Sequence, residues 1–319
     1  MDMSKDIDSA GARPSSLRHL VGMGSIKERT QTAIDAAFAD GTKFPHTMLV
    51  SEPGLGKTEL VSVIAQEMAV TLHHVLGMSI RHVSDLNGLL LNANDKDIVY
   101  FNEADTMKRD FQVALYMAID RGAIVLSGGK SGKAPQAIPI PDITIILDSN
   151  YEFAILPALR DRMKQTFYMP FYEETELAEI VTRRARALKW SLEDSVPAFL
   201  ASLSRGKPRE ALRFLGASHQ KSRAEGSTVV TEAHASRAVE MEGIDSKGLT
   251  TQEQAYLRAL AEGASRLGII ASRIAMPSHT VQQVVEPYLL RSGLISKDDG
   301  RRELTREGRE HVAHLSSKA

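Results

Sequence analysis

The sequence contains no cysteine. This absence excludes disulfide bonds, thiolate metal sites and cysteine nucleophiles, and it is compatible with a cytoplasmic protein. No run of about 18 apolar residues occurs, so we expect no transmembrane helix and no membrane partner. The opening stretch MDMSKDIDSAGARPSS has no apolar core, so we do not expect a secretory signal.

The sequence also lacks a strong charge of either sign. The net charge is −1, which excludes a general electrostatic attraction to nucleic acid and leaves any such binding to a local patch. Hydrophobic residues make up 43% and charged residues 25%, as in an ordinary globular protein. The 319 residues provide enough chain for two or three domains.

The first half of the chain alternates short apolar runs with helical patterns. Residues 1–12 are small, polar and charged, and we expect a disordered tail there. From 13 to 169, three runs predict buried strands of a mostly parallel sheet: TMLV (Thr47–Val50), DIVYF (Asp97–Phe101) and ITIIL (Ile143–Leu147). Helices between them indicate an α/β sandwich over 13–169.

One segment interrupts this alternation, and the pattern changes after it. The stretch AIVLSGGKSGKAPQAIPI at 123–140 has two strand-like arms around a Gly/Lys-rich turn and predicts a protruding β-hairpin. Residues 170–245 have a helical pattern. Residues 246–319 predict three helices, at Thr251–Ala261, Gly268–Ile274 and Ser278–Arg291, and then LISKDDGRRELT as strand, turn and strand. This order is typical of a winged helix-turn-helix.

A phosphate-binding loop follows the first strand. SEPGLGKT fits the pattern G-x-x-x-x-G-K-[ST], except that Ser51 replaces the first glycine. Gly54 and Gly56 allow backbone N–H groups to surround phosphate oxygens. Lys57 would reach the β- and γ-phosphates and Thr58 would bind Mg²⁺, at the start of a helix. The sequence therefore predicts ATP/ADP and Mg²⁺ as cofactors; a glycine turn without a ligand is the competing interpretation.

The acidic residues expected around this loop are altered. Glu52 places a carboxylate beside the phosphates, which is unfavourable unless it turns away or meets the metal. The strand DIVYF ends in Asn102-Glu103 where a hydrolysing site has Asp-Glu. Glu103 is the candidate base, and Asn102 is a metal-side residue without charge. Asp148 or Glu52 is a hypothetical replacement for the missing carboxylate.

Motifs in a consistent order link these segments. They are RPSSLRHLVGMGSIKE (Arg13–Glu28), EPGLGKT, LPALRDRM (Leu156–Met163), FYEETEL, RGKPREALRFL (Arg205–Leu215) and VEPYLLRSGLI (Val285–Ile295). Together they resemble the RuvB family, the AAA+ motors of bacterial Holliday-junction branch migration, from Arg13 to about Val312. The resemblance implies an AAA+ P-loop NTPase sandwich, a helical lid domain and a C-terminal winged helix. It also implies ATP hydrolysis that drives branch migration in recombination and repair.

The resemblance assigns roles to individual residues. It implies Glu103 as catalytic base, Asn150 as the γ-phosphate sensor, and Arg209 as the lid sensor. It implies Arg162 as an arginine finger that acts on a neighbouring subunit, with Arg160 as the alternative. For each arginine the competing interpretation is a solvated surface charge. The implied nucleotide contacts are Arg13, Gly54, Leu55, Gly56, Lys57, Thr58, Glu59, Tyr172 and Arg209, and the implied metal-side residues are Thr58 and Asn102.

The resemblance also implies partners. The family forms a hexameric ring, and the hairpin at 123–140 corresponds to its docking element for RuvA; packing of the hairpin on its own ring is the alternative. DNA would be bound through its backbone by Lys297, Arg301, Arg302 and Arg306 on or beside the wing, although Asp298 and Asp299 oppose this.

The altered acidic residues leave two further functions open. A divergent, ring-forming paralogue could bind nucleotide without hydrolysis and regulate DNA or protein binding. A transcription regulator could read bases through a polar helix surface, formed by His279, Thr280, Gln282 and Gln283.

Overall fold

The structure of the protein is a computed structural model that describes residues 14–126, 136–263 and 265–317. The predicted tail at 1–12, Arg13 and the hairpin turn at 127–135 lie outside the described residues. The chain forms two compact units: one runs to Ile180 and takes in Lys207–Arg209, and the other holds Val181–Gly206 and the chain from Glu210 onward.

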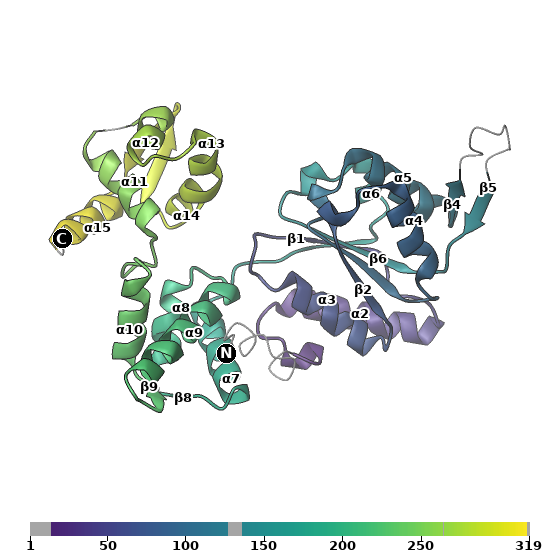
Figure 1. The fold of residues 1–319 in the computed structure, drawn as a ribbon, viewed down its shortest axis with the longest axis horizontal. Coiled ribbons are helices and arrows are strands. Elements are labelled where there is room, and N and C mark those ends of the chain that lie inside the picture. The colour runs from purple at the N-terminus through teal and green to yellow at the C-terminus, as the bar shows by residue number, and fades with distance from the viewer. Residues whose placement is uncertain (1–13, 127–135, 264, 318–319) are drawn as a thin grey trace. The chain divides into compact units, whose positions relative to one another are not determined.

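The first unit is built on a sheet of five parallel strands. In spatial order these are β2 (Leu72–Leu76), β3 (Ile98–Asn102), β6 (Thr144–Ser149), β1 (Thr47–Val50) and β7 (Gln165–Tyr168) (Figure 1). The three predicted strands are confirmed, with β3 and β6 displaced by one or two residues. Val50 lies beside Ser149 on one side and Tyr168 on the other, so the ends of neighbouring strands meet at one edge.

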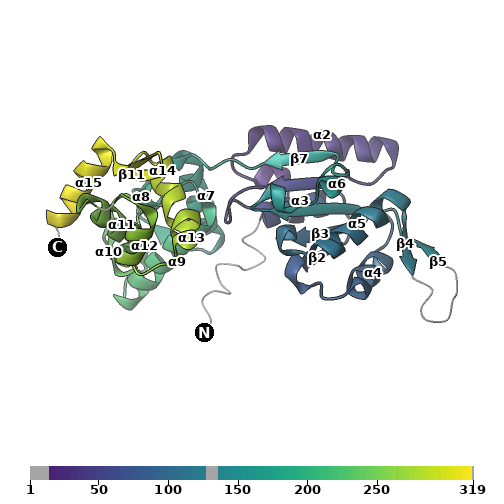
Figure 2. The same cartoon turned by 90° about the horizontal axis from the view of Figure 1, so that it is seen from above.

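Helices cover both faces of this sheet, as expected for an α/β sandwich (Figure 2). The helices are α2 (Gly24–Asp40), α3 (Lys57–Glu67), α4 (Val83–Asn92), α5 (Arg109–Arg121) and the short α6 (Pro157–Arg160). One apolar core joins α2 and α3 to Leu49, Tyr100 and Ile146. A second core joins α4 and α5 to Met48 and Phe101 on the opposite face.

The predicted hairpin follows directly after α5 and belongs to the same unit. Its arms are β4 (Ala123–Leu126) and β5 (Gln136–Pro139), which pair antiparallel with Ile124 opposite Ile138. The N–H of Ile140 donates to the carbonyl of Gly122 and closes the base of the arms. The two predicted strands are therefore confirmed.

A helical region follows, as predicted. Its helices are α7 (Glu174–Ala187), α8 (Val196–Leu203), α9 (Pro208–Ala224) and α10 (Glu232–Met241), and two very short parallel strands, β8 (Ser191–Leu192) and β9 (Val229–Val230), join its loops. The indole of Trp190 stacks on the imidazole of His219, with ring centroids 3.7 Å apart and planes 3° from parallel.

The C-terminal region has the predicted winged-helix elements and one more helix. They are α11 (Thr251–Ala261), α12 (Leu267–Arg273), α13 (Ser278–Thr280), a π-helical turn (Val281–Val285), α14 (Glu286–Arg291), β10 (Ile295–Asp298), β11 (Arg301–Leu304) and α15 (Arg306–Ser317). Helix α15 was not predicted from the sequence; it packs against α11. The predicted single helix at Ser278–Arg291 is interrupted because Pro287 supplies no N–H for a regular helical hydrogen bond.

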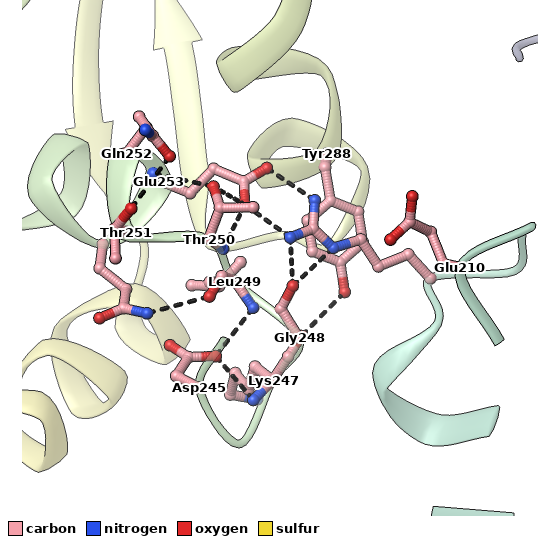
Figure 3. Close-up of polar contacts among 12 residues, drawn as sticks. Glu210, Asp245, Lys247, Gly248, Leu249, Thr250, Thr251, Gln252, Glu253 and Tyr288 are labelled. Atoms are coloured by element: carbon pink, nitrogen blue, oxygen red, sulfur yellow. Dashed lines mark hydrogen bonds and ion pairs between the residues drawn. The ribbon is translucent and has the colours of Figure 1, made fainter. Parts of the chain in front are cut away.

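An arginine joins the helical region to the winged helix within the second unit. Arg205 forms an ion pair with Glu253 at 2.7 Å, and its Nε donates to the carbonyl of Gly248 at 2.6 Å. Its guanidinium also lies over the ring of Tyr288, 4.4 Å from the centroid. Figure 3 shows the segment from Asp245 to Glu253 with Tyr288 beside Gly248. Within the described residues, no helix is both long enough and apolar enough to span a membrane.

Candidate nucleotide site

The loop between β1 and α3 has the backbone form that phosphate binding requires. Gly54 and Gly56 have φ angles of 89° and 92°, in the left-handed region that favours glycine. A Cβ on Gly54 would lie 3.0 Å from the Cβ of Arg209, so space also restricts this position. Helix α3 begins at Lys57, so its first N–H groups lie at the end of the loop, where a helix favours an anion.

Lys57 connects this loop to the end of β6. Its Nζ donates to Oδ1 of Asn150 at 2.8 Å and to the carbonyl of Ser51 at 3.0 Å. The Ser51 hydroxyl accepts a longer bond from the same amine at 3.3 Å. The structure thus brings the predicted phosphate lysine and the predicted sensor together, and Ser51 holds the lysine. Burial lowers the pKa of Lys57, while Asp148 and Asp105 oppose that change.

Glu52 faces a cation instead of the metal side of the site. Its carboxylate forms an ion pair with Lys207 at 2.7 Å. Lys207 lies two residues before Arg209 and belongs to the same compact unit as the loop. Lys207 therefore neutralises the carboxylate that stands beside the phosphate loop. The hypothesis that Glu52 replaces the missing metal-side acid loses its support.

The residues on the metal side of the loop centre on the Thr58 hydroxyl. Its oxygen lies 3.3 Å from the hydroxyl of Tyr100, and the Asn102 amide nitrogen donates to it at 3.4 Å. Tyr100 was not among the site residues predicted from the sequence. The available signal was strand periodicity, because residues two apart on β3 point to the same face and Tyr100 therefore accompanies Asn102.

Asp148 lies behind this hydroxyl and is 1% exposed. One carboxylate oxygen accepts from the Tyr100 hydroxyl, and the other accepts from the backbone N–H of Glu103 at 2.6 Å. Burial raises the pKa of Asp148, and these two hydrogen bonds act in the opposite direction. Both oxygens are engaged, so Asp148 does not stand as an open carboxylate beside Thr58.

The backbone of Glu103 is held in an unusual conformation. Its φ is 52°, in the left-handed region that non-glycine residues rarely adopt. Gly77 lies against it so closely that a Cβ there would be 2.5 Å from the Glu103 carbonyl oxygen. Such backbone positions persist only where the surroundings fix them, and they gather at functional sites.

Two residues distant in sequence lie over the phosphate loop. The N–H of Arg209 donates to the carbonyl of Gly54 at 3.3 Å. The hydroxyl of Tyr172 lies 3.7 Å from where a Cβ on Gly56 would be, and burial raises the pKa of this tyrosine. Leu55 is 1% exposed, so its side chain belongs to the core and only its backbone can face a ligand. Glu59 lies in the first turn of α3.

The two candidate finger arginines differ in their surroundings. Arg162 forms an ion pair with Asp120 at 2.8 Å, and its side chain is 38% exposed. Arg160 is less exposed, pairs with Glu152 at 3.2 Å and lies over the ring of Phe153. Arg162 is therefore the more available of the two for a neighbouring molecule.

The donor groups fit Mg²⁺ that arrives with a nucleotide. Among the described residues, no group of three His, Cys, Asp or Glu side chains could hold a metal by itself. Mg²⁺ commonly has one or two protein ligands, with phosphate oxygens and water completing its shell. Thr58 would supply the protein oxygen, and Asn102 lies beside it.

The structure corrects one of the predicted DNA contacts. Arg302 is 5% exposed, and its Nε donates to Glu286 at 2.8 Å beneath the wing. Its charge is therefore used inside the fold and is not presented to a phosphate backbone. Lys297, Arg301 and Arg306 are exposed; Arg306 pairs with Glu310 at the surface.

The sheet order, the phosphate loop, the helical region and the winged helix together define an AAA+ P-loop ATPase. The chain matches the family models for the P-loop domain of the Holliday junction DNA helicase RuvB at 12–169, the RuvB AAA lid domain at 172–245 and the RuvB C-terminal winged helix domain at 246–313. The chain belongs to the RuvB family.

Individual relatives agree with this assignment. The chain is 32% identical to the RuvB branch migration complex subunit of Rubrobacter xylanophilus, over 96% of this chain and 87% of that protein. It is 33% identical to the corresponding subunit of a Nocardioides species, over 95% and 86%. The solved structure of the Thermotoga maritima RuvB Holliday junction branch migration motor matches with a TM-score of 0.81 and 25% identity, over 95% of this chain and 98% of that one.

Proposed function

We propose that this protein is an ATP-dependent motor that drives branch migration of Holliday junctions in recombination and repair. The observation that carries the proposal is that Lys57 donates to Asn150 at the phosphate loop, and that Thr58 is connected through Tyr100 and Asp148 to the backbone of Glu103. These are the groups that phosphoryl transfer to water requires, because catalysis consists of positioning and charge stabilisation.

Each group has a separate task in this proposal. Lys57 and the start of α3 hold the phosphates, and Asn150 orients the γ-phosphate. Glu103 accepts the proton of the attacking water, and its fixed backbone keeps the carboxylate in place. Arg209 lies above Gly54 and senses the γ-phosphate. Mg²⁺, bound with the nucleotide at Thr58, supplies charge neutralisation.

A ring of identical subunits completes the site in this proposal. Arg162 enters the nucleotide site of a neighbour and stabilises the charge that develops on the transferred group. Three aromatic side chains near it in the sequence support an interface here: Tyr151 is 59% exposed, Phe153 86% and Tyr168 62%. The Tyr168 hydroxyl donates at 2.8 Å to Glu152, which lies between Tyr151 and Phe153, and exposed apolar groups that lie close together commonly mark association surfaces. The family's hexamer is the assembly we propose.

The wing and the β4–β5 hairpin carry the proposed contacts with DNA and with a partner protein. Lys297, Arg301 and Arg306 bind the DNA backbone without reading bases, as movement along DNA requires. The hairpin of β4 and β5 docks a RuvA-like protein, and the exposed Val125 on its arm offers an apolar contact. We place the protein in the cytoplasm.

One observation favours a second function. Asn102 stands where a hydrolysing site has an acid, so the chain could bind nucleotide and form a ring without turnover. The retained base, sensor and finger argue for hydrolysis, since a pure binding protein has no chemical use for them.

Steady-state ATP hydrolysis, measured with and without a four-way DNA junction, tests the proposal. We expect turnover that DNA increases, and a loss of about 100-fold or more in Glu103→Gln, with nucleotide affinity retained. A wild-type chain that binds ATP without turnover, and gains turnover in Asn102→Asp, would establish the second function instead.

Mixing two inactive variants tests the action of Arg162 on a neighbour. Glu103→Gln and Arg162→Ala should each be inactive alone. A mixed ring should recover activity, because about a quarter of its interfaces combine an intact base with an intact finger. Arg237→Ala is the matched control: this arginine also pairs with a carboxylate at the surface, 3.4 Å away, and should retain activity. No recovery on mixing would contradict the trans role.

A further inference from the structure

A short chain of polar groups connects Thr58 to Glu103 through the interior of the first unit. The Thr58 hydroxyl contacts the Tyr100 hydroxyl, Tyr100 contacts Asp148, and Asp148 contacts the backbone of Glu103. Tyr100 is fully buried and Asp148 nearly so, and they come from the neighbouring strands β3 and β6. The chain of contacts thus links the proposed metal ligand to the proposed base.

Asp148 fixes the direction of the hydrogen bonds in this chain, because its carboxylate accepts from both of its neighbours. The Tyr100 hydroxyl has one proton, and it donates that proton to Asp148. Its oxygen can then only accept, so Thr58 must donate its own proton to Tyr100. This arrangement turns the oxygen lone pairs of Thr58 away from the tyrosine, so that they can accept from Asn102 and bind a cation.

Asn102 does not perform this task. Its amide nitrogen donates to Thr58 at 3.4 Å, which is the wrong direction for receiving the Thr58 proton. A carboxylate at 102 would accept the Thr58 proton directly. The chain has an acceptor on the other side of the hydroxyl instead.

Resting on the function proposed above, we propose that Tyr100 and Asp148 are positioning residues of the nucleotide site. They accept the proton of Thr58 in place of an acid at 102, and they hold the backbone of Glu103 through the second carboxylate oxygen. The charge absent from 102 is thereby replaced by a buried acceptor one hydrogen bond further from the metal.

The test compares nucleotide affinity with and without the metal. The dissociation constant of a fluorescent ADP is measured in EDTA and in Mg²⁺, and the value in EDTA divided by the value in Mg²⁺ reports the metal-dependent part of the affinity. We expect Tyr100→Phe to lower this ratio by about tenfold, while the affinity in EDTA changes by less than about twofold. Asp148→Asn should act in the same direction, because Tyr100 and Glu103 donate to different oxygens of Asp148 and an amide replaces one of them with an NH₂ donor.

A double variant with an acid at position 102 distinguishes a positioning role of Tyr100 from a packing role. We expect Asn102→Asp, added to Tyr100→Phe, to return the ratio to within about twofold of wild type, because a carboxylate accepts the Thr58 proton directly. The matched control is Tyr256→Phe. This buried tyrosine donates to Glu286 at 2.9 Å in the other unit, and its loss should leave the ratio unchanged.

Two outcomes would overturn the proposal: a normal ratio in Tyr100→Phe, or failure of Asn102→Asp to restore it. If Tyr100→Phe does not fold, Asp148→Asn with and without Asn102→Asp makes the same test at nearly constant volume. ADP is used so that the result does not depend on turnover. A chain that shows the expected ratios but hydrolyses no ATP would refute the proposed motor and retain this inference.

Discussion

Two buried tyrosines in different regions donate to buried carboxylates, and the two pairs differ in what else surrounds them. Tyr100 donates to Asp148 in the sandwich, and Tyr256 donates to Glu286 in the winged helix. Both tyrosines are fully buried, and the carboxylates are 1% and 2% exposed. Burial raises the pKa of each tyrosine, so both hydroxyls keep their protons.

The winged-helix pair includes its own cation. Arg302 donates to both oxygens of Glu286, and this hydrogen bonding raises the pKa of the arginine. Asp148 has a hydroxyl and a backbone N–H as hydrogen-bond partners, and the cation that acts on it is Lys57, which also serves the phosphate loop. A buried carboxylate with a dedicated arginine is a closed structural unit. A buried carboxylate without one depends on the functional groups around it.

The largest effect on stability should come from Glu286→Ala. The variant leaves the Arg302 charge buried without its partner, which costs about 3–5 kcal/mol. Urea unfolding followed by circular dichroism should show an early transition of the winged helix. Replacement of both residues, as Glu286→Leu with Arg302→Met, should recover most of the loss. If the double variant is as unstable as the single one, Arg302 is not the cause.

A smaller loss should follow Asp148→Ala. This change leaves the Tyr100 hydroxyl and the Glu103 N–H without their acceptor, but Lys57 keeps its hydrogen bonds to Asn150 and Ser51, so we expect about 2 kcal/mol. The same urea measurement, made beside Glu286→Ala, gives the comparison directly. A loss as large as that of Glu286→Ala would show that the two carboxylates have equivalent structural roles.

The smallest effect should come from Lys207→Ala. The pair with Glu52 is partly exposed, with side chains 25% and 43% accessible, so its contribution should stay below about 1 kcal/mol. The difference from wild type should shrink further at about 1 M salt, which screens such pairs. A difference that persists at high salt would mean that Lys207 acts through packing.

The sequence could predict the parts of the site that lie on one continuous segment. The phosphate loop, its helix and the strands β1, β3 and β6 follow from glycine placement and apolar runs. Contacts between strands could not be predicted in the same way. Tyr100 belongs to an apolar run and looks like core, and its hydroxyl has a role only because β6 places Asp148 beside it.

Arg302 illustrates a second limit. Adjacent strand residues point to opposite faces, so one of Arg301 and Arg302 had to face the helices. The sequence did not say which one, because the deciding partner, Glu286, lies 16 residues earlier on a helix. The basic residues predicted to bind DNA on the wing therefore included Arg302, whose charge is paired with Glu286 inside the fold. Helix α15, which follows the wing, was not predicted from the sequence.

The stacked pair of Trp190 and His219 gives the protein an internal optical reporter. The chain has a single tryptophan, so its indole fluorescence arises from the helical region alone. The ring stacking fixes the environment of that indole, and any opening of this region changes the emission. Unfolding of the winged helix alone should leave the tryptophan emission unchanged. Unfolding of the helical lid region should change it. One protein sample can therefore report on its lid without a label.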